Sequence, residues 1–279
     1  MGKILIATGT TAIIEDTNKF LLGPGSYTTA VEIVDPLEGT ICRLKDYPEP
    51  VWIASGGMLQ DDNYQIHPTL CGGYNANSTL GHGCFKLSNG DWSQMSLSFG
   101  QQTWGMGSAV IGQNLWLLGG RKQHQYSLTA QTMHLNVTGT LVSGPDLAEA
   151  VTGACVAVLT GVYFGGKIVA VLGGMDYMTA ESGGLKSMQL FSCKSTYNPV
   201  DMACQRLSLK GPEMNHPRYG FACGSMITKE GDPILLAMKS HTNTSLEILD
   251  LSKPFKDWKW NEGKNLKKII YLLKFITIH

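Results

Sequence analysis

The sequence predicts an all-β protein, a β-propeller of repeated four-stranded antiparallel blades, and three observations support this fold class. Glycine is abundant, at 33 of 279 residues, and only 16% of the residues are charged, a composition that suits strands joined by many tight turns. Short apolar runs end in a glycine pair, as in "HPTLCGG", "NLWLLGG" and "KIVAVLGG". These runs recur at intervals of about 50 residues, which is the spacing of a repeat array.

Each repeat contains four candidate strands in the same order. The first strand is rich in small residues, because it would line a crowded axis where backbones approach closely. The second strand ends at the glycine pair. The third alternates apolar and polar residues, as in "VEIVD" and "LEILD", which is typical of a half-buried strand. The fourth is polar, as expected of an outer edge. This order indicates a propeller blade, whereas a β-sandwich, the competing architecture, predicts no glycine pair at this interval.

About five blades fit this frame, and six are expected in the full protein. The propeller covers residues 1–263, with blades at approximately 4–48, 52–96, 104–147, 153–212 and 219–263. The first blade lacks an inner strand of small residues, which would leave an unpaired edge. Either the chain is part of a longer protein, which is the interpretation we prefer, or the basic, apolar tail at 264–279 supplies the missing strand.

The recurrence of the glycine pair needs a structural reason. Glycine has no Cβ, so it is suited to places where one backbone passes very close to another. We therefore predict that each blade has one such place, where its second strand ends beside the neighbouring blade.

Several of these features together resemble the kelch repeat. The glycine pair is followed by a strand such as "VEIVDP" or "LEILDL" and then by Trp92 or Trp258. The segment 213–227, "EMNHPRYGFACGSMI", contains the Met, Pro, Arg and apolar inner strand in kelch order. The third-strand Tyr of that family is mostly absent, and the fifth glycine pair is degenerate and ends at Ser240. The resemblance implies a propeller that binds other proteins through its blade loops.

Two pairs among the seven cysteines flank single hairpin loops. Cys71 ends a second strand and Cys84 begins the third, while Cys193 ends a third strand and Cys204 begins the fourth. The Cα atoms of each pair are therefore expected within the window of about 4.4–6.8 Å that a disulfide requires. We expect two disulfides, and the alternative is a coincidence among small apolar residues.

The other three cysteines show no such pairing. Cys155 and Cys223 fall at equivalent places in neighbouring inner strands and are expected to be buried thiols. Cys42 has no evident partner. An odd count of cysteines fits a chain whose partner cysteine lies elsewhere as well as it fits a free thiol.

The expected disulfides place the protein in an oxidising compartment. Glycosylation sequons at Asn77, Asn136 and Asn243 agree with that placement. We therefore expect an extracellular or secreted glycoprotein. The alternative is a cytoplasmic kelch protein whose thiols are reduced.

Several functional classes are not supported by the sequence. The 22 basic and 22 acidic residues cancel, so nothing indicates a nucleic-acid partner. The longest apolar candidate, "IIYLLKFITI" at 269–278, contains a Lys and is about half the length that membrane insertion as a span requires. The sequence contains no HExxH, no CxxC and no phosphate-binding loop. We expect no metal, no cofactor and no catalytic residue, and hence no enzyme.

The first functional hypothesis is a non-catalytic propeller that binds a protein partner through its blade loops. Loops that lead into inner strands ring the mouth of the central channel, and they carry the candidate partner-binding residues Trp52, Trp104, His216, Arg218 and Tyr219. An exposed Trp there would be a binding anchor, whereas a Trp between blades would be core; likewise Arg218 would serve either a partner or the packing of the loop. The alternative function is an extracellular propeller that binds or modifies carbohydrate.

Overall fold

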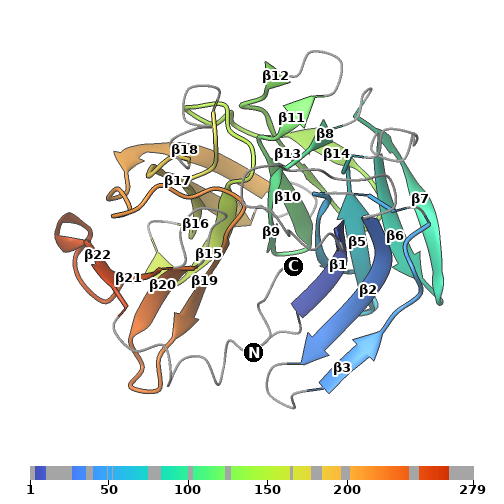
Figure 1. Cartoon of the computed structure of the whole chain (residues 1–279), viewed down its shortest axis with the longest axis horizontal. Helices are drawn as coiled ribbons and strands as arrows, with labels where there is room; N and C mark the ends of the chain where they lie inside the picture. Colours follow the sequence, from blue (N-terminus) through green and yellow to red (C-terminus); the bar gives the residue numbers. More distant parts are fainter. Residues whose placement is uncertain are drawn as a thin grey trace, which may run out of the picture.

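The structure, a computed structural model, is all-β, as predicted. It describes residues 4–10, 27–35, 40–48, 50–51, 53–74, 83–99, 103–122, 127–163, 166–176, 184–195, 202–238 and 245–263. The described strands form four four-stranded and two three-stranded sheets. Five of these sheets follow one another around a central axis in sequence order, like the blades of a propeller (Figure 1).

Each blade is an antiparallel sheet whose strands follow in chain order, with the inner strands of the second to fifth blades side by side at the axis. The first blade contains β1 (Ile4–Thr10), β2 (Tyr27–Asp35) and β3 (Thr40–Arg43). The second contains β4 (Ser55–Gln60), β5 (Ile66–Cys71), β6 (Gly83–Ser88) and β7 (Asp91–Ser98). The third contains β9 (Gly107–Ile111), β10 (Asn114–Leu118), β13 (Thr132–Leu135) and β14 (Leu141–Ser143). The fourth contains β15 (Cys155–Tyr163), β16 (Lys167–Leu172), β17 (Met188–Ser195) and β18 (Met202–Lys210). The fifth contains β19 (Ala222–Ile227), β20 (Pro233–Met238), β21 (Leu246–Asp250) and β22 (Trp260–Glu262).

The predicted strand order is found in all five blades. Among the described strands, the first blade has no inner strand, and none joins β1 to the fifth blade, so the ring is not closed in this part of the chain. A small additional sheet, which the sequence analysis did not predict, is formed by β8 (Thr103–Trp104), β11 (Arg121–Lys122) and β12 (Ser127–Leu128). The tail at 264–279 and the degenerate closure at Ser240 lie outside the described residues.

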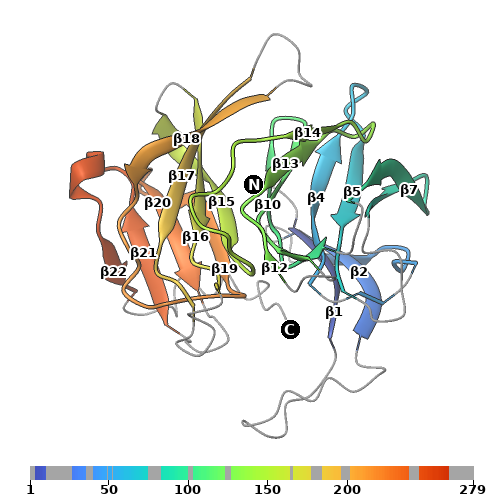
Figure 2. The same cartoon turned by 90° about the horizontal axis from the view of Figure 1, so that it is seen from above.

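The blades have two ends, because successive strands run in opposite directions. We call the end at which second strands finish in glycine pairs, such as Gly119 and Gly120, the glycine face. The opposite end carries the hairpin turns, such as the turn at 61–65 between β4 and β5, and we call it the turn face. Seen from above, the fourth and fifth blades lie on one side of the molecule and the first and second on the other (Figure 2).

The glycine pair performs the predicted role at the glycine face. A Cβ on Gly119 would lie only 2.5 Å from the carbonyl oxygen of Val151, which belongs to the segment leading into the next blade. The N–H of Gly120 donates a hydrogen bond of 2.7 Å to that same oxygen. Both glycines have positive φ, at 66° and 105°, which a residue with a Cβ adopts only with strain. The same arrangement occurs at Gly72–Gly73 against Thr103 and at Gly173–Gly174 against Arg218.

A second set of backbone bonds connects the segments that lead into the inner strands. Gly105 donates to the carbonyl of Ile53 at 3.1 Å, Gly153 donates to Gly105 at 2.8 Å, and Gly220 donates to Gly153 at 2.8 Å. All four residues have φ between 52° and 65°. Ile53 is the exception in residue type, because a β-branched side chain is strongly disfavoured in this conformation.

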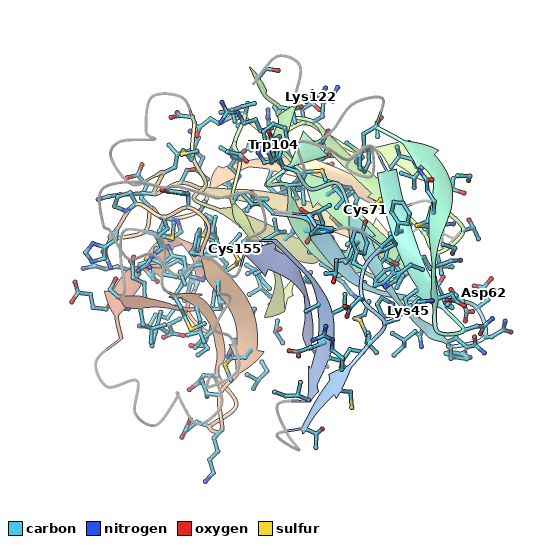
Figure 3. The ribbon with its side chains drawn as sticks, turned by 45° about the vertical axis from the view of Figure 1, so that its right-hand side comes forward. Lys45, Asp62, Cys71, Trp104, Lys122 and Cys155 are labelled. Atoms are coloured by element: carbon cyan, nitrogen blue, oxygen red, sulfur yellow. A yellow bond between two sulfur atoms is a disulfide. The ribbon has the colours of Figure 1, made fainter. Side chains whose placement is uncertain are left out.

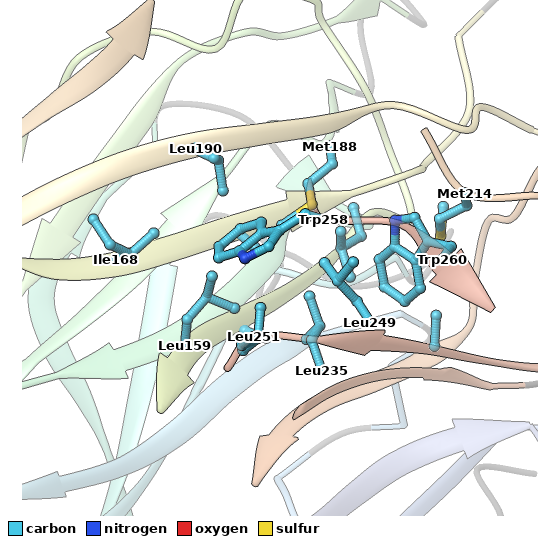
Figure 4. Packing of buried hydrophobic residues seen from close by; sticks show 14 of the residues in the cluster. Leu159, Ile168, Met188, Leu190, Met214, Leu235, Leu249, Leu251, Trp258 and Trp260 are labelled. Carbon is cyan, nitrogen blue, oxygen red and sulfur yellow. The ribbon is translucent and has the colours of Figure 1, made fainter. Parts of the chain in front are cut away.

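Most of the core lies within and between the blades. The largest cluster joins the fourth and fifth blades, where Trp258 and Trp260 pack with Met188, Leu190 and Leu249 (Figure 4). The indole nitrogens remain satisfied: Nε1 of Trp258 donates to the carbonyl of Lys253 and Nε1 of Trp260 to the carbonyl of Pro212, each at 3.0 Å. Smaller clusters join the first blade to the second, the second to the third and the third to the fourth. The blades are therefore fixed to one another, which gives the surface loops a rigid support.

Candidate functional site

The predicted tryptophan anchors are not on the described surface. Trp52 lies outside the described residues. Trp104 is only 8% exposed and packs its ring 5.0 Å from that of Tyr74 in a tilted arrangement. The strand β8 that contains Trp104 pairs with β11, which fixes the residue in the small additional sheet. Trp104, labelled in Figure 3, is therefore a core residue and not a partner-binding anchor, which corrects the surface assignment.

Arg218 is also an interior residue, so its assignment to a partner-binding surface is wrong. It is fully buried with Glu247, and its Nη2 lies 3.0 Å from Oε1 of that carboxylate. The same Nη2 donates to Oγ of Ser245 at 2.7 Å. Glu247 in turn accepts the backbone N–H groups of Asn215 and His216, at 2.6 and 3.1 Å. The pair ties the loop before β19 to β21, and breaking a buried pair of this kind is strongly destabilising.

Two of the five candidates remain near the surface. His216 is half-buried, and its Nε2 lies 3.5 Å from Oε1 of Glu262, which is mostly exposed. Tyr219 is half-buried in the same loop, directly before Gly220, whose N–H donates to the carbonyl of Gly153. The structure therefore brings His216, Arg218 and Tyr219 together in one loop, as the sequence predicts, but divides them between the surface and the interior.

Both predicted disulfides are present. Cys71–Cys84 joins β5 to β6 and Cys193–Cys204 joins β17 to β18. In each pair the two residues lie directly opposite each other in the strand register. Their Cα atoms are 4.0 Å apart, slightly closer than the predicted window.

A third disulfide corrects the assignment of Cys155 and Cys223 as thiols. These residues belong to β15 and β19, the inner strands of neighbouring blades, and their Cα atoms are 5.9 Å apart. The physical reason is that inner strands converge at the axis, so equivalent positions in adjacent blades come within bonding distance. The equivalent positions of Cys155 and Cys223 are visible in the sequence, but flanking a single hairpin, the criterion that predicts the other two disulfides, does not apply to two strands of different blades. Cys42 is free and exposed.

The turn face of the second blade holds a cluster that the sequence analysis missed. Nε2 of His67 lies 3.2 Å from Oδ2 of Asp61, and Nδ1 of His67 lies 2.9 Å from Oγ of Ser88. Three consecutive strands hold these groups, because Asp61 follows β4, His67 is in β5 and Ser88 ends β6. The signal was absent from the linear sequence, since only the pairing of the strands brings the residues together.

Asp61 also organises the turn that follows it. Its Oδ1 accepts the backbone N–H groups of Asn63 and Gln65, at 2.9 and 2.8 Å. The hydrogen bond from His67, helped by these two backbone bonds, holds the pKa of the Asp61 carboxyl below its ordinary value. The carboxylate is therefore ionised at neutral pH and acts only as an acceptor.

The turn that Asp61 organises presents two apolar side chains to solvent. Tyr64 is 81% exposed and Ile66 is 58% exposed. Tyr64 has a φ of 62°, a conformation uncommon for a residue with a bulky side chain. Asp62, in the same turn, is labelled at the periphery of the molecule in Figure 3. The side chain of Tyr64 thus projects from a turn whose backbone is held by the Asp61 carboxylate, and that of Ile66 projects from the first residue of β5.

One of the three predicted glycosylation sites falls in the described part of the chain. Asn136 is half-buried in the turn between β13 and β14, and its Oδ1 accepts hydrogen bonds from Oγ1 and N of Thr138 and from N of Thr140. No hydrogen bond among the described residues uses Nδ2, the atom that would carry a glycan. Asn77 and Asn243 lie outside the described residues.

The described ranges contain neither a metal-binding cluster nor a membrane-spanning helix. No group of three or more His, Cys, Asp or Glu side chains is placed there to hold a metal ion. In the same ranges, no helix has the length and apolar character needed to cross a membrane.

Comparison with known proteins supports the fold and does not extend to a family. No family model and no curated protein sequence matches the chain. Among solved structures, the structure of YjhT is similar, with a TM-score of 0.59 and 12% sequence identity over 94% of this chain and 81% of that chain. At this identity the similarity shows the fold alone. The propeller-like fold is thus confirmed, while the kelch assignment stays a prediction.

Proposed function

We propose that this protein is an extracellular binding scaffold whose partner, another protein, docks on the turn face of the second blade. The observation that carries the proposal is Tyr64, which is 81% exposed on a turn with positive φ. Tyr is among the residue types enriched at binding hot spots, and the exposed Ile66 two residues later extends the apolar surface that Tyr64 offers to a partner.

The turn is suited to binding because little freedom is left to lose. Asp61 fixes the backbone of the turn through two hydrogen bonds to its carboxylate, and His67 fixes Asp61 from β5. The disulfide between Cys71 and Cys84 fastens β5 to β6 in the same sheet. A side chain presented by a preorganised segment pays less conformational entropy on binding.

The oxidising compartment is supported by the three disulfides, which persist mainly outside the reducing cytosol. The sequon at Asn136, in a turn on the turn face, is compatible with this placement. Binding through this surface requires no cofactor and no chemical reaction.

The test compares two variants on the same face. Tyr64→Ala combined with Ile66→Ala removes the proposed anchors, and Ile227→Ala is the matched control, because Ile227 is 41% exposed at the turn-face end of β19 in the fifth blade. The labelled, multimerised protein is applied to an array of purified recombinant receptor ectodomains and secreted proteins. We expect at least one specific binder, with affinity reduced at least tenfold by the double substitution and unchanged by the control.

Two results would overturn the proposal. One is equal loss of binding in the Ile227→Ala control and the double variant, which would mean that the turn of the second blade is not the docking surface. The other is a binder whose affinity is insensitive to the double substitution and falls instead on substitution of His216 or Tyr219, which would move the docking surface to the glycine face.

A further inference from the structure

The cluster at the turn face contains the three residue types that act together in nucleophilic catalysis. Oγ of Ser88 lies 2.9 Å from Nδ1 of His67, and Oδ2 of Asp61 lies 3.2 Å from Nε2 of the same ring. We propose that Ser88, His67 and Asp61 form a hydrolytic centre for carboxylic esters. This goes beyond the binding function, which does not need it, and it would overturn the expectation that the chain is not an enzyme.

The hydrogen bonds define where the protons lie. An ionised Asp61 accepts hydrogen bonds and cannot donate them, so Nε2 of His67 carries the proton that faces it. Nδ1 is then unprotonated, and it accepts the hydroxyl proton of Ser88. The contact of Nδ1 with the carbonyl of Leu87 is longer, at 3.4 Å, and is not a hydrogen bond in this tautomer. The ring thus has the protonation state that a general base for Ser88 requires.

Asp61 and His67 are also held in place, and both are partly exposed to water. Asp61 cannot turn away from His67 without losing its bonds to Asn63 and Gln65. The side chains of His67 and Asp61 are 12% and 21% exposed, so solvent reaches the edge of the site. Ser88 is half-buried at the end of β6. An ester presented from solvent can therefore approach Oγ along the rim of the blade.

The turn after Ser88 supplies candidate donors for the developing oxyanion. Asn89 and Gly90 both have positive φ, at 52° and 82°. In the described part of the chain, no hydrogen bond uses the backbone N–H of either residue. Backbone N–H groups that stabilise the oxygen of a tetrahedral intermediate are the usual partners of a nucleophilic serine.

The proposed reaction consumes one ester and one water and gives one carboxylic acid and one alcohol. Oγ of Ser88 bonds to the acyl carbon while its proton moves to Nδ1 of His67, and the ionised Asp61 stabilises the resulting imidazolium through Nε2–H. The bond to the leaving oxygen then breaks, and that oxygen takes the proton from His67. Water next attacks the acyl-serine, its proton moves to Nδ1, and the acid leaves as the proton returns to Oγ.

The test is site-resolved labelling of the oxidised full chain with a fluorophosphonate, which reacts with activated serines, followed by peptide mapping. We expect the label on Ser88 of the unmodified protein, so the result does not depend on any variant that fails to fold. Ser252 is the internal control, because its Oγ bonds to a carboxylate, Oδ1 of Asp250, at 2.6 Å without an intervening histidine. We expect no label on Ser252.

Variants then separate catalysis from structure. His67→Gln retains a hydrogen-bonding side chain but removes the base, and we expect labelling of Ser88 and hydrolysis of p-nitrophenyl acetate to fall about 100-fold with an unchanged thermal transition. Ser252→Ala should change neither readout. The proposal is wrong if Ser88 is unlabelled while a serine hydrolase mixed into the same sample is labelled, if Ser252 is labelled equally, or if His67→Gln labels as fast as the unmodified protein.

Discussion

The junction between the fourth and fifth blades and the junction between the second and third blades use the same backbone geometry but different side-chain bonds. At both, a glycine pair meets the carbonyl of the next blade. The fourth and fifth blades add a covalent link, Cys155–Cys223, between their inner strands. Both junctions also contain serine hydrogen bonds, one at the first, where Oγ of Ser225 accepts the N–H of Thr160 at 2.8 Å. Between the second and third blades, Oγ of Ser55 donates to the carbonyl of Met106 at 2.6 Å, and Oγ of Ser108 donates to that of Gly56 at 3.0 Å.

This difference shows which contacts are common to the blade junctions and which are specific to one junction. The backbone contact at the glycine pair repeats because the distance between blades is the same around the axis. The small residues of the inner strands only have to fit, so cysteine and serine are both accepted and bond in their own ways. The proposed binding surface and the proposed ester site both lie on the second blade.

The largest expected effect follows from removing the covalent link. Replacing both Cys155 and Cys223 by Ala opens a loop of 68 residues, which lowers the free energy of unfolding by about 4 kcal/mol in the chain-entropy account. Replacing Ser108 by Ala at the other junction removes the two hydrogen bonds that its hydroxyl makes with the backbone of Gly56, and we expect a loss of about 2 kcal/mol. Urea unfolding of the two variants measures both values, and equal losses would mean that the two junctions do not differ in strength.

The next effect tests what the junctions share. A Cβ on Gly173 would lie 2.5 Å from the carbonyl oxygen of Arg218, and the residue has a φ of 56°. We expect Gly173→Ala to destabilise the protein by about 3 kcal/mol, from the clash and the strain together. Gly231→Ala is the matched control, because Gly231 has a φ of 95° with nothing within 4 Å of the added Cβ, and it should cost only about 1 kcal/mol. Thermal unfolding that shows the same loss for both would contradict the close-approach argument.

The sequence predicted the repeated features well and the local ones poorly. The order of strands, the role of the glycine pair and two disulfides within hairpins all follow from patterns that recur along the chain. The Cys155–Cys223 bond and the burial of Arg218 against Glu247 depend on how neighbouring strands come together, which a linear pattern does not show. Asp61, His67 and Ser88 are separated along the chain in the same way, so neither their spacing nor their residue types predicted the cluster.

A smaller effect concerns the backbone hydrogen bonds that link the segments leading into the inner strands, at the glycine face. Here the second blade again differs from the others. Ile53 occupies a position with φ of 52°, which in the next three blades is occupied by Gly105, Gly153 and Gly220. Ile53 is 37% exposed, so a substitution loses little buried area. We expect Ile53→Gly to stabilise the protein by about 1 kcal/mol through relief of backbone strain. A lower melting temperature for this variant would show that the Ile53 side chain contributes packing that outweighs the strain.

The smallest effect compares two carboxylates at the turn face. Asp61 in the second blade and Asp250 in the fifth both have a lowered pKa, the first chiefly through the hydrogen bond of His67 and the second chiefly through that of Ser252. A carboxyl whose pKa is lower in the folded than in the unfolded state stabilises the fold fully above its ordinary value, about 3.9, and this contribution is lost as the pH falls through the folded value. The advantage of the unmodified protein over Asp61→Asn should therefore be complete well above the ordinary pKa of about 3.9 and be lost as the pH falls below it, through the lowered pKa of the folded state. Carboxyl titration by NMR sharpens the comparison, because His67→Ala, which removes the donor, should raise the pKa of Asp61 toward its ordinary value and leave that of Asp250 where it is. A shift of both, or of neither, would mean that the hydrogen bond of His67 does not control the pKa of Asp61, and it would count against the contact between the ring and the carboxylate on which the proposed ester site depends.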